Sequence, residues 1–367
     1  MSAPLRIAFF DSWFEDAAKG SGTAAAIAGL ARGLEALGHR VDRVRPRGLP
    51  PGPALQRLLY NAGLPLRLRR SGASYDLAVG FDLDGFLLRR PPARRYIVCL
   101  KGVAAEEASF ESGWPRLRLG LLARLEGLNA RRADRVLVTS AHSREAAARA
   151  YRLPPQKLAV VPEGIDLAPW DALRAGPGSA GPRRGGPVIL SVARQYPRKN
   201  TLSLVEAMPA VRAQVPGARL RVVGGGPMLR ALERRAAALG LTTAGPGGAA
   251  VFLGEVPGDE EVRREYLGAD VFCLPSLQEG FGIAFLEAMA AGLPIVAARA
   301  GAVPEVAAEG EAALLAPPGD AAALAGALVR LLKDAELRAR LGEGGRRRVR
   351  RYAWPEVARL FLAEAAT

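Results

Sequence analysis

Cysteine and histidine are scarce in this sequence of 367 residues, and so are long apolar runs. The two cysteines, Cys99 and Cys273, lie in strand-like apolar runs, which predicts buried thiols rather than a disulfide. His39 and His142 are the only histidines, and neither has a ligand-like neighbour in the sequence, so we expect no metal site. No apolar run reaches the roughly 18 to 20 residues that a membrane-spanning helix needs.

The features of a secretory signal are also absent from the start of the chain. The short apolar run of residues 5–10 is followed directly by Asp11, Glu15 and Asp16, which is unlike a signal peptide. We therefore expect a cytoplasmic protein. A peripheral position at the inner face of a membrane stays open.

Aromatic residues make up only 6% of the chain and form no stacking row, which disfavours a nucleic-acid-binding protein. Residues 1–165 carry 26 Lys and Arg against 15 Asp and Glu, whereas residues 166–367 carry 25 against 21. An anionic membrane or a phosphorylated substrate would suit this basic first half. Because 46 of the 51 basic residues are Arg in an Ala- and Gly-rich chain, a composition bias without any partner is the alternative.

The length fits two domains of ordinary size. Short apolar runs alternate with helical stretches rich in Ala, Leu and Arg, which is typical of parallel sheets covered by helices on both faces. We therefore expect an α/β protein with two doubly wound, Rossmann-like domains that face each other across a cleft. The predicted parts are a first domain (1–170), a Gly/Pro-rich linker (171–187), a second domain (188–350) and a C-terminal helix that crosses back to the first domain (351–367).

The expected elements follow from the same alternation of patterns. Strands are expected at residues 5–10, 40–44, 77–80, 96–100, 135–139 and 158–162, and again at 188–193, 219–224, 251–253, 271–274, 295–297 and 312–315. Helices are expected at residues 23–37, 116–132, 143–151, 202–214, 228–239, 260–267 and 284–291. In such sheets ligands bind outside the carboxyl ends of the strands.

The segment 279–287 places two carboxylates eight positions apart around a Gly-Phe-Gly turn that opens a helix. Unpaired N–H groups at a helix start suit phosphate or sugar oxygens. Glu279 is placed to accept hydrogen bonds from sugar hydroxyls, and Glu287 from a ribose diol. The alternative is a pair of ordinary surface acids, which the apolar neighbours Phe281 and Ile283 disfavour because an unpaired Glu is costly in such a setting.

Two further segments offer groups for phosphate. Arg194 and Lys199 follow the first strand of the second half, where fixed positive charge stabilises a departing diphosphate, and Arg198 beside them is either a third such group or a solvated neighbour. Near the N-terminus, Gly22 belongs to a glycine loop that precedes an Ala-rich helix and presents N–H groups. An ordinary helix cap is the alternative there. A second glycine run, 224–226, fits a tight turn as well as a ligand contact.

Taken together and in this order, the motifs resemble those of the retaining glycosyltransferases of the GT-B fold, in the family 4 group (glycosyl transferases group 1). The resemblance spans most of residues 185 to 350. The motifs that carry it lie at residues 191–200, 223–227, 252–256, 269–276, 279–287 and 301–305.

This resemblance implies a reaction and a set of roles. The reaction is metal-independent transfer of a hexose from a nucleoside-diphosphate sugar to a glycan or lipid acceptor, with retained anomeric configuration and no cofactor. By resemblance, Glu279 and the backbone of Gly280, Phe281, Gly282 and Ile283 hold the sugar, Glu287 holds the ribose, and Val256 marks where backbone atoms read the base. Arg194, Lys199 and Gly22 hold the diphosphate, and the predicted catalytic residues are Arg194, Lys199 and Glu279.

The sequence departs from the family pattern at Lys101, where many members carry a histidine beside the reacting sugar. The roles open to Lys101 are to bind an acidic acceptor, to pair with Glu106 or Glu107, or to be exposed. The family reaction does not demand a strong protein base, because the departing phosphate can take the acceptor proton on the same face. A sugar-nucleotide epimerase or hydrolase is the rival, but it needs an acid or base that the chain does not show.

Three other features carry weaker predictions. Asp82 and Asp84 match a short D-x-D pattern that holds Mn²⁺ in another transferase fold, but a hard cation needs more oxygen ligands, so we interpret them as loop acids. Asp166 is expected to be structural. The segment 115–132, with a second basic-apolar patch at 64–70, is either an amphipathic membrane-surface helix or a helix that covers its own sheet.

Overall fold

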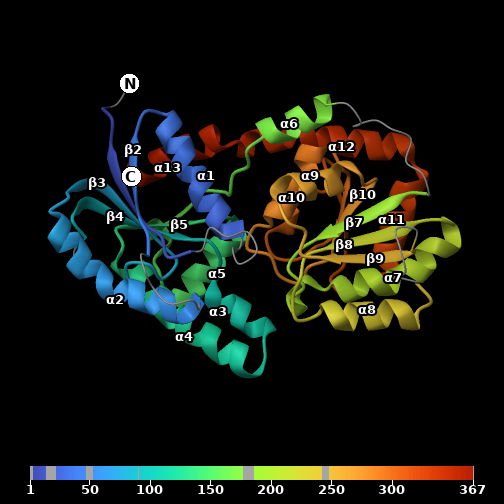
Figure 1. Ribbon diagram of the computed structural model, residues 1–367, viewed down its shortest axis with the longest axis horizontal. Coiled ribbons are helices and arrows are strands. Elements are labelled where there is room, and N and C mark those ends of the chain that lie inside the picture. Colours follow the sequence, from blue (N-terminus) through green and yellow to red (C-terminus); the bar gives the residue numbers. More distant parts are fainter. Residues whose placement is uncertain are drawn as a thin grey trace. The chain divides into compact units, whose positions relative to one another are not determined.

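The computed structural model describes residues 3–13, 22–46, 53–89, 91–176, 186–241 and 248–366 (Figure 1). These residues form two compact units. The first unit holds residues 1–164 together with 353–367, and the second holds residues 165–352. The division after Gly164 lies six residues before the domain end expected from the sequence at residue 170.

Helix α6 (Ala168–Ala175) explains this difference, because it occupies the start of the predicted linker. Its Trp170 is buried and packs edge-on against Tyr266, with ring centroids 5.5 Å apart. Arg174 donates a hydrogen bond of 2.6 Å to the carbonyl of Ala290. These contacts hold α6 on the second unit, so residues 171–175 are not linker. Residues 177–185 of the predicted linker lie outside the described residues.

The first unit is built on a parallel sheet whose strands lie in the order β2-β1-β3-β4-β5-β6. Ile7 pairs with Val41 on one side and with Leu77 on the other, so the first strand lies inside the sheet. The chain moves outward from β1 to β2 in one direction and from β3 to β4 in the other, so the topological switch point lies between β1 and β3. The strands are β1 (Arg6–Phe10), β2 (Arg40–Val44), β3 (Tyr75–Phe81), β4 (Ala93–Leu100), β5 (Arg135–Val138) and β6 (Leu158–Val160).

Helices cover both faces of this sheet because successive strand residues point to opposite sides. One face packs against α2, α4 and α5 in a single apolar cluster, whereas α1 and α13 lie side by side elsewhere in the unit (Figure 1). Leu30 of α1 and Phe361 of α13 meet Cys99 and Leu137 of the strands at a small cavity, which places both helices on the other face. The helices are α1 (Gly22–Ala36), α2 (Pro53–Ser71), α3 (Ala104–Glu107), α4 (Gly113–Arg132), α5 (Ala141–Tyr151) and α13 (Trp354–Ala366).

The second unit holds another parallel sheet, with the order β12-β11-β10-β7-β8-β9. Its switch point lies between β7 and β10, which pair through Val271 with Ile189 and Phe272 with Leu190. The strands are β7 (Val188–Val192), β8 (Arg219–Val223), β9 (Ala250–Gly254), β10 (Val271–Leu274), β11 (Ile295–Ala298) and β12 (Ala313–Ala316).

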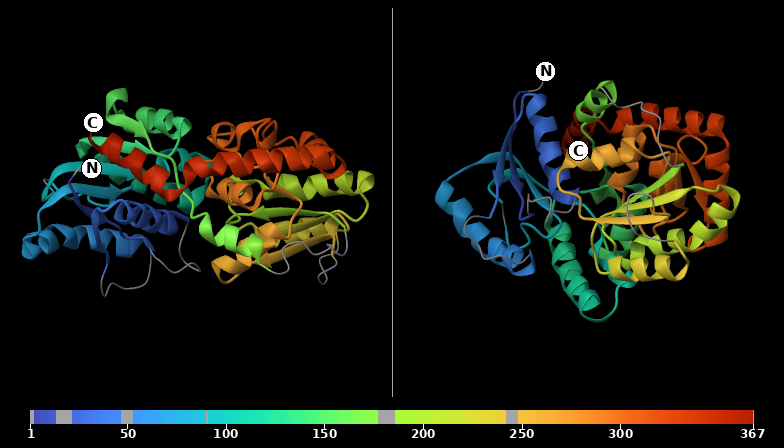
Figure 2. Two further views of the ribbon diagram at one scale, coloured as in Figure 1. Left: turned by 90° about the horizontal axis from the view of Figure 1, so that it is seen from above. Right: turned by 45° about the vertical axis from the view of Figure 1, so that its right-hand side comes forward.

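Two apolar clusters fill the second unit, one on each face of its sheet. Helices α7, α8 and α11 contribute to the first cluster, and α9 and α10 contribute to the second. Figure 2 shows these layers from two further directions. The helices that follow α6 are α7 (Thr201–Gln214), α8 (Leu229–Ala238), α9 (Asp259–Leu267), α10 (Ile283–Ala291), α11 (Ala321–Lys333) and α12 (Ala335–Val349), with a π-helical turn at Pro304–Ala308.

The structure confirms the predicted class of two doubly wound α/β sheets, and each expected strand is present within three residues at either end. Helix α2 was not expected, because Gly63 and Pro65 within it are typical helix breakers. The sequence prediction also lacked α3, α6, α11 and α12. No helix among the described residues is both long enough and apolar enough to cross a membrane.

Helix α13 returns to the first unit beside the point where the chain leaves it. The Trp354 ring lies against Gly29 of α1, where an added Cβ would lie 2.1 Å from the ring. The same ring lies 2.5 Å from a Cβ built on Gly164. Both glycines are therefore required by this close packing.

Both cysteines are buried free thiols, as predicted. Burial raises the pKa of Cys99 to about 12 and raises the pKa of Cys273 above its usual value. Neither thiol is therefore a ready nucleophile.

Candidate functional site

The loops that follow β7 and β10 lie at the switch point of the second unit. The loop after β7 carries Arg194 and Lys199, and the loop after β10 carries Glu279. The two loops are joined by a backbone hydrogen bond of 2.8 Å from the Leu277 N–H to the Arg198 carbonyl. Parallel sheets bind ligands at this edge. The fold therefore brings the predicted diphosphate and sugar residues to one place.

Lys199 and Glu279 form a buried ion pair in this place. The distance from Lys199 Nζ to Glu279 Oε1 is 2.6 Å, and the side chains are 15% and 7% exposed. The same oxygen accepts a hydrogen bond of 2.8 Å from the Ser276 hydroxyl. No hydrogen bond reaches Oε2 of Glu279 from the described residues, so this oxygen keeps its capacity to accept. These two residues, predicted to hold separate parts of the donor, are partners in the structure.

The turn between Glu279 and α10 depends on two glycines. Gly282 caps α10 with φ 90°, and no side chain of the described residues caps this helix start. Gly301 has φ 55°, and an added Cβ there would lie 2.5 Å from the Glu279 carbonyl oxygen. The Ala302 N–H also donates to that carbonyl at 2.9 Å. The 301–305 motif thus supports Glu279 through the backbone, and the first N–H groups of α10 are open to an anion.

The loop that carries Arg194 is held by the glycine turn 224–226. An added Cβ on Gly224 would lie 2.0 Å from the Ala193 carbonyl oxygen, and one on Gly226 would lie 2.7 Å from the Gln195 nitrogen. The Gln195 N–H donates to the Gly225 carbonyl at 2.8 Å. These glycines therefore serve the close approach of two loops, as the predicted tight turn requires.

Arg194 itself is largely exposed. Its side chain is 44% exposed, and Nη2 lies 4.0 Å from Glu255 Oε1. The guanidinium groups of Arg194 and Arg198 lie 5.9 and 5.4 Å from the Tyr196 ring centroid. Arg198 also donates to the Gln278 side chain at 3.2 Å, so it is a bonded residue and not merely a solvated neighbour. Arg194 is the one of the two whose charge faces outward.

Glu287 is half-buried on α10 and accepts a hydrogen bond of 2.7 Å from the Tyr266 hydroxyl. Burial raises the pKa of Glu287 to about 7. The Tyr266 hydrogen bond and Arg263 act in the opposite direction, and Asp259 adds to the rise. The carboxyl group therefore changes its charge close to neutral pH.

The remaining residues that were predicted to bind the nucleotide sugar differ in their burial and in their place in the fold. Phe281 is buried and packs edge-on against Tyr352, with ring centroids 5.7 Å apart, so only its backbone is available to a ligand. Gly280 lies beside it in the turn, and Ile283 opens α10. Val256 follows β9 and packs partly against the apolar cluster of the second unit. Gly22 opens α1 in the first unit, but the rest of its loop, residues 19–21, lies outside the described residues.

Lys101 lies at the end of β4 in the first unit and pairs with Glu163. The distance from Lys101 Nζ to Glu163 Oε2 is 2.9 Å, and the side chains are 9% and 4% exposed. The predicted alternatives, pairing with Glu106 or Glu107 or simple exposure, are therefore wrong. The sequence could not show this pair, because the two residues lie 62 positions apart. Although burial alone lowers it, the pKa of Lys101 is raised overall, mainly by the Glu163 charge.

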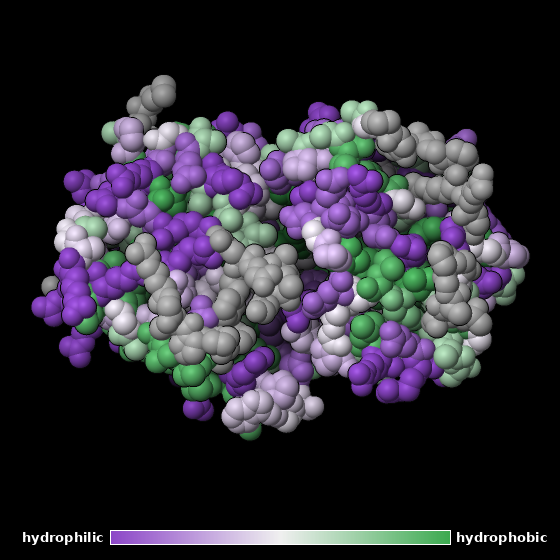
Figure 3. All heavy atoms as spheres, in the orientation of Figure 1, coloured by the Kyte–Doolittle hydropathy of each residue, from purple (hydrophilic) through white to green (hydrophobic). Residues whose placement is uncertain are grey.

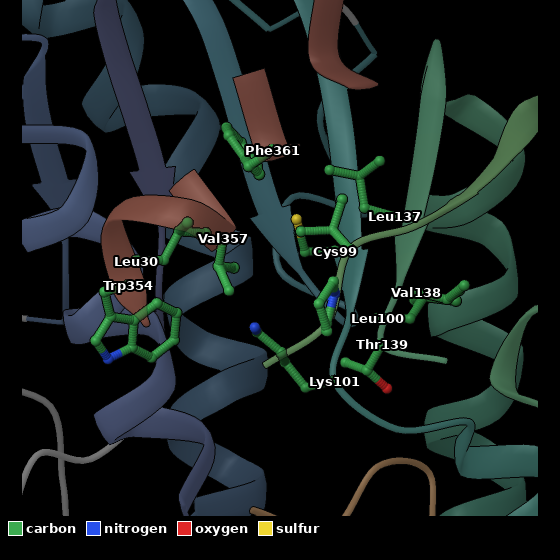
Figure 4. Close-up of a pocket in the computed structure, with 12 residues that line it drawn as sticks. Leu30, Cys99, Leu100, Lys101, Leu137, Val138, Thr139, Trp354, Val357 and Phe361 are labelled. Atoms are coloured by element: carbon green, nitrogen blue, oxygen red, sulfur yellow. The ribbon is translucent and has the colours of Figure 1, made fainter. Parts of the chain in front are cut away.

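A small cavity of about 10 Å³ lies beside Lys101. Apolar side chains from α1, β4, β5 and α13 surround it, including Leu30, Leu137 and Phe361 (Figure 4). Its size is at the lower limit for one water molecule. We regard it as a packing feature of the first unit.

Asp82 and Asp84 are more than loop acids. Both are buried after β3, beside the switch point of the first unit. Asp84 accepts hydrogen bonds of 2.7 Å from the Ser12 hydroxyl and 3.0 Å from Asn61. Burial raises the pKa of Asp84 to about 6, although Arg57 and Ser12 oppose the rise. Asp84 therefore ties together the loops after β1 and β3 and helix α2.

Several residues of these sites were missed from the sequence. Ser276, Tyr266 and Glu163 each make a contact with a predicted residue, Gln195 accepts from the Thr201 hydroxyl, and Arg57 lies within ion-pair distance of both acids of the first unit. Gln195 lies in the motif at residues 191–200 and Ser276 in the motif at residues 269–276. Their place in these motifs was the signal that could have identified them. His142 also has an unexpected neighbour, since its Nε2 lies 2.6 Å from Glu106 Oε1. Asp166 accepts from the Ala168 N–H at 3.2 Å, next to the start of α6.

Two family models match this chain. The model described as Glycosyl transferases group 1 matches residues 178–348. The model described as Glycosyltransferase Family 4 matches residues 20–169.

Among curated proteins, the chain is similar to the GDP-mannose-dependent alpha-(1-6)-phosphatidylinositol monomannoside mannosyltransferase of Mycolicibacterium smegmatis. The two are 34% identical over 282 residues, which cover 74% of this chain and 70% of the relative. The protein of the same description from Mycobacterium tuberculosis is 30% identical over 341 residues, which cover 88% of this chain and 82% of the relative.

Among solved structures, the chain is similar to sucrose-phosphate synthase from Thermosynechococcus elongatus. The TM-score is 0.77 at 24% identity, over 98% of this chain and 97% of that chain. This likeness shows a shared GT-B fold.

Proposed function

Because the chain belongs to the family 4 glycosyltransferases (glycosyl transferases group 1), we propose that it transfers a hexose from a nucleoside-diphosphate sugar to an acceptor with retained anomeric configuration and without a metal ion. The observation that carries this proposal is the buried Lys199–Glu279 pair beside the uncapped start of α10. This arrangement joins a fixed cation, a sugar-binding carboxylate and free N–H groups in one place.

In the proposed donor site, Arg194 and Lys199 contact the diphosphate. Their charges stabilise the oxygen that departs with the nucleotide, and Arg194 offers a planar fork for two phosphate oxygens. These two cations, of which Lys199 is held in place by Glu279, supply the charge that a metal ion supplies in other transferases. Oε2 of Glu279 accepts from sugar hydroxyls, with the backbone of the 280–283 turn beside it. Glu287 accepts from the ribose diol.

The proposed reaction does not require a protein side chain to act as a base. The departing phosphate takes the proton of the acceptor hydroxyl on the face from which it leaves, so the new bond forms on the same face. Lys101, which stands in place of the histidine of many family members, is engaged with Glu163. We therefore assign Lys101 a positioning role on the acceptor side and no proton transfer.

The direct test is a donor screen. GDP-mannose is the first donor to try, because both curated relatives are described as GDP-mannose-dependent. A donor present at about 100 times its dissociation constant is expected to raise stability by about 2.7 kcal/mol, which a thermal-shift comparison of GDP-, UDP- and ADP-sugars detects. Transfer should survive EDTA. Binding of no nucleotide sugar, or strict dependence on Mn²⁺, contradicts the proposal.

We further propose that the acceptor is linked to a lipid and that the first unit contacts an anionic membrane. The relatives' descriptions include phosphatidylinositol monomannoside, and the first half of the chain is strongly basic. Large apolar side chains are exposed on α2 and α4, and Figure 3 shows hydrophobic atoms gathered along α2. We call these residues the α2–α4 surface: Leu55, Leu58, Leu59, Leu66, Trp114, Leu117 and Leu121.

We propose that helix α4 combines both of the roles that the sequence left open. Ala123 and Ala130 face the core of the first unit, so the helix does cover its own sheet. Trp114, Leu117 and Leu121 recur at helical spacing on the opposite side and are 75%, 68% and 52% exposed. Exposed Arg residues lie among them at positions 116, 118 and 124. An apolar stripe flanked by Arg is typical of a helix that lies in a membrane interface.

A membrane-binding prediction follows for the variant Trp114→Ser/Leu117→Ser. We expect its binding to anionic vesicles to fall at least ~10-fold, because burying a large apolar side chain contributes about 1.5–3 kcal/mol. Vesicle co-sedimentation with increasing anionic lipid measures this. Leu360→Ser, an exposed leucine on α13, is the matched control and should bind as wild type does. Equal recovery of wild-type protein in the supernatant at every lipid composition, at low and at physiological salt, contradicts the prediction.

A second prediction concerns pH and Glu287. Because the pKa of Glu287 is raised to about 7, the carboxyl is protonated below that pH and loses an acceptor for the ribose diol. We expect the donor KM to rise about tenfold from about pH 8 to about pH 6, while kcat changes less. Glu287→Gln should give a high KM that no longer depends on pH in this range. Steady-state kinetics at several pH values measure this dependence. If the donor KM of Glu287→Gln changes with pH as that of the wild type does, Glu287 is not the group that titrates.

A further inference from the structure

Helices α9 and α10 lie side by side in the second unit, and a tyrosine of α9 reaches a carboxyl group of α10 (Figure 1). The Tyr266 hydroxyl donates to Glu287 Oε2 at 2.7 Å. The Ala284 carbonyl lies 3.4 Å from the same hydroxyl, which is long for an O–H donor. Because the hydroxyl has a single proton to donate, Glu287 is its main acceptor.

The ring of Tyr266 is held by two other aromatic rings. Tyr266 is fully buried, and its ring stacks on Phe272 of β10 with centroids 5.5 Å apart and an interplanar angle of 28°. Trp170 of α6 packs edge-on against it, with centroids also 5.5 Å apart. This packing needs only a ring, which a phenylalanine would supply as well. The hydroxyl is therefore explained by Glu287 and not by the aromatic packing.

The Tyr266 hydroxyl keeps its proton at neutral pH. Burial raises the pKa of Tyr266 well above its usual value, and the charge of Glu287 raises it further. A charged carboxylate offers only acceptors, so the proton of this hydrogen bond comes from Tyr266. Hydrogen bonds to charged acceptors are roughly twice as strong as those between neutral groups. The bond therefore fixes the direction of the Glu287 carboxylate.

Two charged residues of α9 also influence Glu287, but neither bonds to its carboxylate. Arg263 lowers the pKa of Glu287 and Asp259 raises it, and these two residues lie 3.6 Å apart as an ion pair. Of the residues that the structure describes, Tyr266 is the donor that bonds the carboxylate, and Oε1 accepts no hydrogen bond. Oε1 therefore keeps its capacity to accept, and the bond to Oε2 decides which way it faces.

We propose that Tyr266 is the positioning residue that directs Glu287 toward the ribose of the donor, and that its hydroxyl sets how strongly the site prefers a ribonucleotide to a 2′-deoxyribonucleotide. The inference rests on the proposed function, because that function places the ribose diol at Glu287. A carboxylate held in one direction accepts from the ribose hydroxyls without first being ordered, so less entropy is lost on binding. A rotating carboxylate loses this advantage, mainly for nucleotides that carry the 2′-hydroxyl.

The test is isothermal titration calorimetry with GDP, UDP and ADP, each compared with its 2′-deoxy form, at a pH above the Glu287 pKa of about 7. Wild-type protein should bind its ribonucleotide at least ~10-fold more tightly than the 2′-deoxy form, because a site built to hydrogen-bond a hydroxyl rejects the analogue that lacks it. Tyr266→Phe keeps the ring packing and should narrow this ratio at least ~5-fold. With the identified donor sugar, the same variant should raise KM and change kcat less than ~3-fold, because Tyr266 acts on the ribose and not on the departing diphosphate.

Two further variants separate positioning from packing. Glu287→Ala should abolish the ribose preference by itself, and Tyr266→Phe should change nothing further in that background, because the tyrosine acts through Glu287. Trp170→Phe disturbs the same aromatic cluster but keeps the hydroxyl, so it should lower the free energy of unfolding and leave the ratio as in wild type. Denaturant unfolding shows that each variant folds.

A wild-type ribose preference in Tyr266→Phe overturns the inference, and so does an equal loss of that preference in Trp170→Phe. A further effect of Tyr266→Phe in the Glu287→Ala background also overturns it. In these cases the protein still binds a nucleotide and still needs Glu287, so the proposed function is unaffected. If no nucleoside diphosphate binds, or if Glu287→Ala does not change the ribose preference, the proposed donor site itself fails and this inference fails with it.

Discussion

Lys199→Met should reduce kcat for glycosyl transfer at least ~100-fold, the scale observed when one preorganised stabiliser of developing charge is removed. Lys199 Nζ lies 2.6 Å from Glu279 at the switch-point edge, so its position is fixed before a substrate arrives. The charge of the departing diphosphate grows in the transition state, and a fixed cation therefore lowers the barrier more than it tightens binding. Single-turnover and steady-state kinetics with the identified donor measure the effect.

The same substitution should also destabilise the second unit, because it leaves the Glu279 carboxylate buried without its partner. Breaking a buried ion pair on one side costs about 3–5 kcal/mol. The double variant Lys199→Met/Glu279→Gln removes both charges and should recover most of that stability while its activity stays low. Denaturant unfolding of the single and double variants tests this. A double variant with wild-type activity would show that the pair is structural only.

Arg194→Ala should likewise slow transfer ~100-fold with little change in stability. Its side chain is 44% exposed, and its contacts with the described residues are a 4.0 Å approach to Glu255 and a position 5.9 Å from the Tyr196 ring centroid, so little in the folded protein depends on it. A group that the fold uses little and that follows the same strand as Lys199 is available to the diphosphate that we propose is bound there. Arg194→Lys should retain part of the activity, since it keeps the charge but not the planar fork.

Arg198→Ala is the matched control for Arg194. Both guanidinium groups flank Tyr196, but Arg198 donates to Gln278 within the loops. Removing Arg198 should therefore reduce stability more than removing Arg194 does, and reduce kcat less. Thermal unfolding together with kinetics distinguishes the two. The reverse order of effects would transfer the diphosphate role from Arg194 to Arg198.

Local patterns were sufficient to predict the architecture. A sheet that helices cover on both faces needs strands that are apolar on both sides, and short apolar runs meet this requirement. All twelve expected strands are present among the described residues. The helices with strong periodicity were predicted as well. Helix α2 was not, because local propensity at Gly63 and Pro65 opposes it and burial of Tyr60, Leu64 and Leu68 overrides that propensity.

The candidate site was predictable only as a set of residues and not as a set of contacts. The motifs placed Arg194, Lys199, Glu279 and Glu287 after strands, and the strand order then brought the first three to the edge between β7 and β10. Strand order is decided by which sheet edges and helices pack together, and this is a property of the whole unit. No local pattern encodes it.

The sequence by itself determined the fold class, the two-unit organisation and the chemical types of the groups at the strand ends. Only the tertiary structure decided which groups are partners. Lys199 meets Glu279 across 80 positions and Lys101 meets Glu163 across 62, and Arg57 Nη2 lies 3.7 Å from Asp82 and 3.8 Å from Asp84. The physical reason is that ion pairs and hydrogen bonds act over a few ångströms in space. Their partners are therefore chosen by the packing that brings distant segments together and excludes water from them.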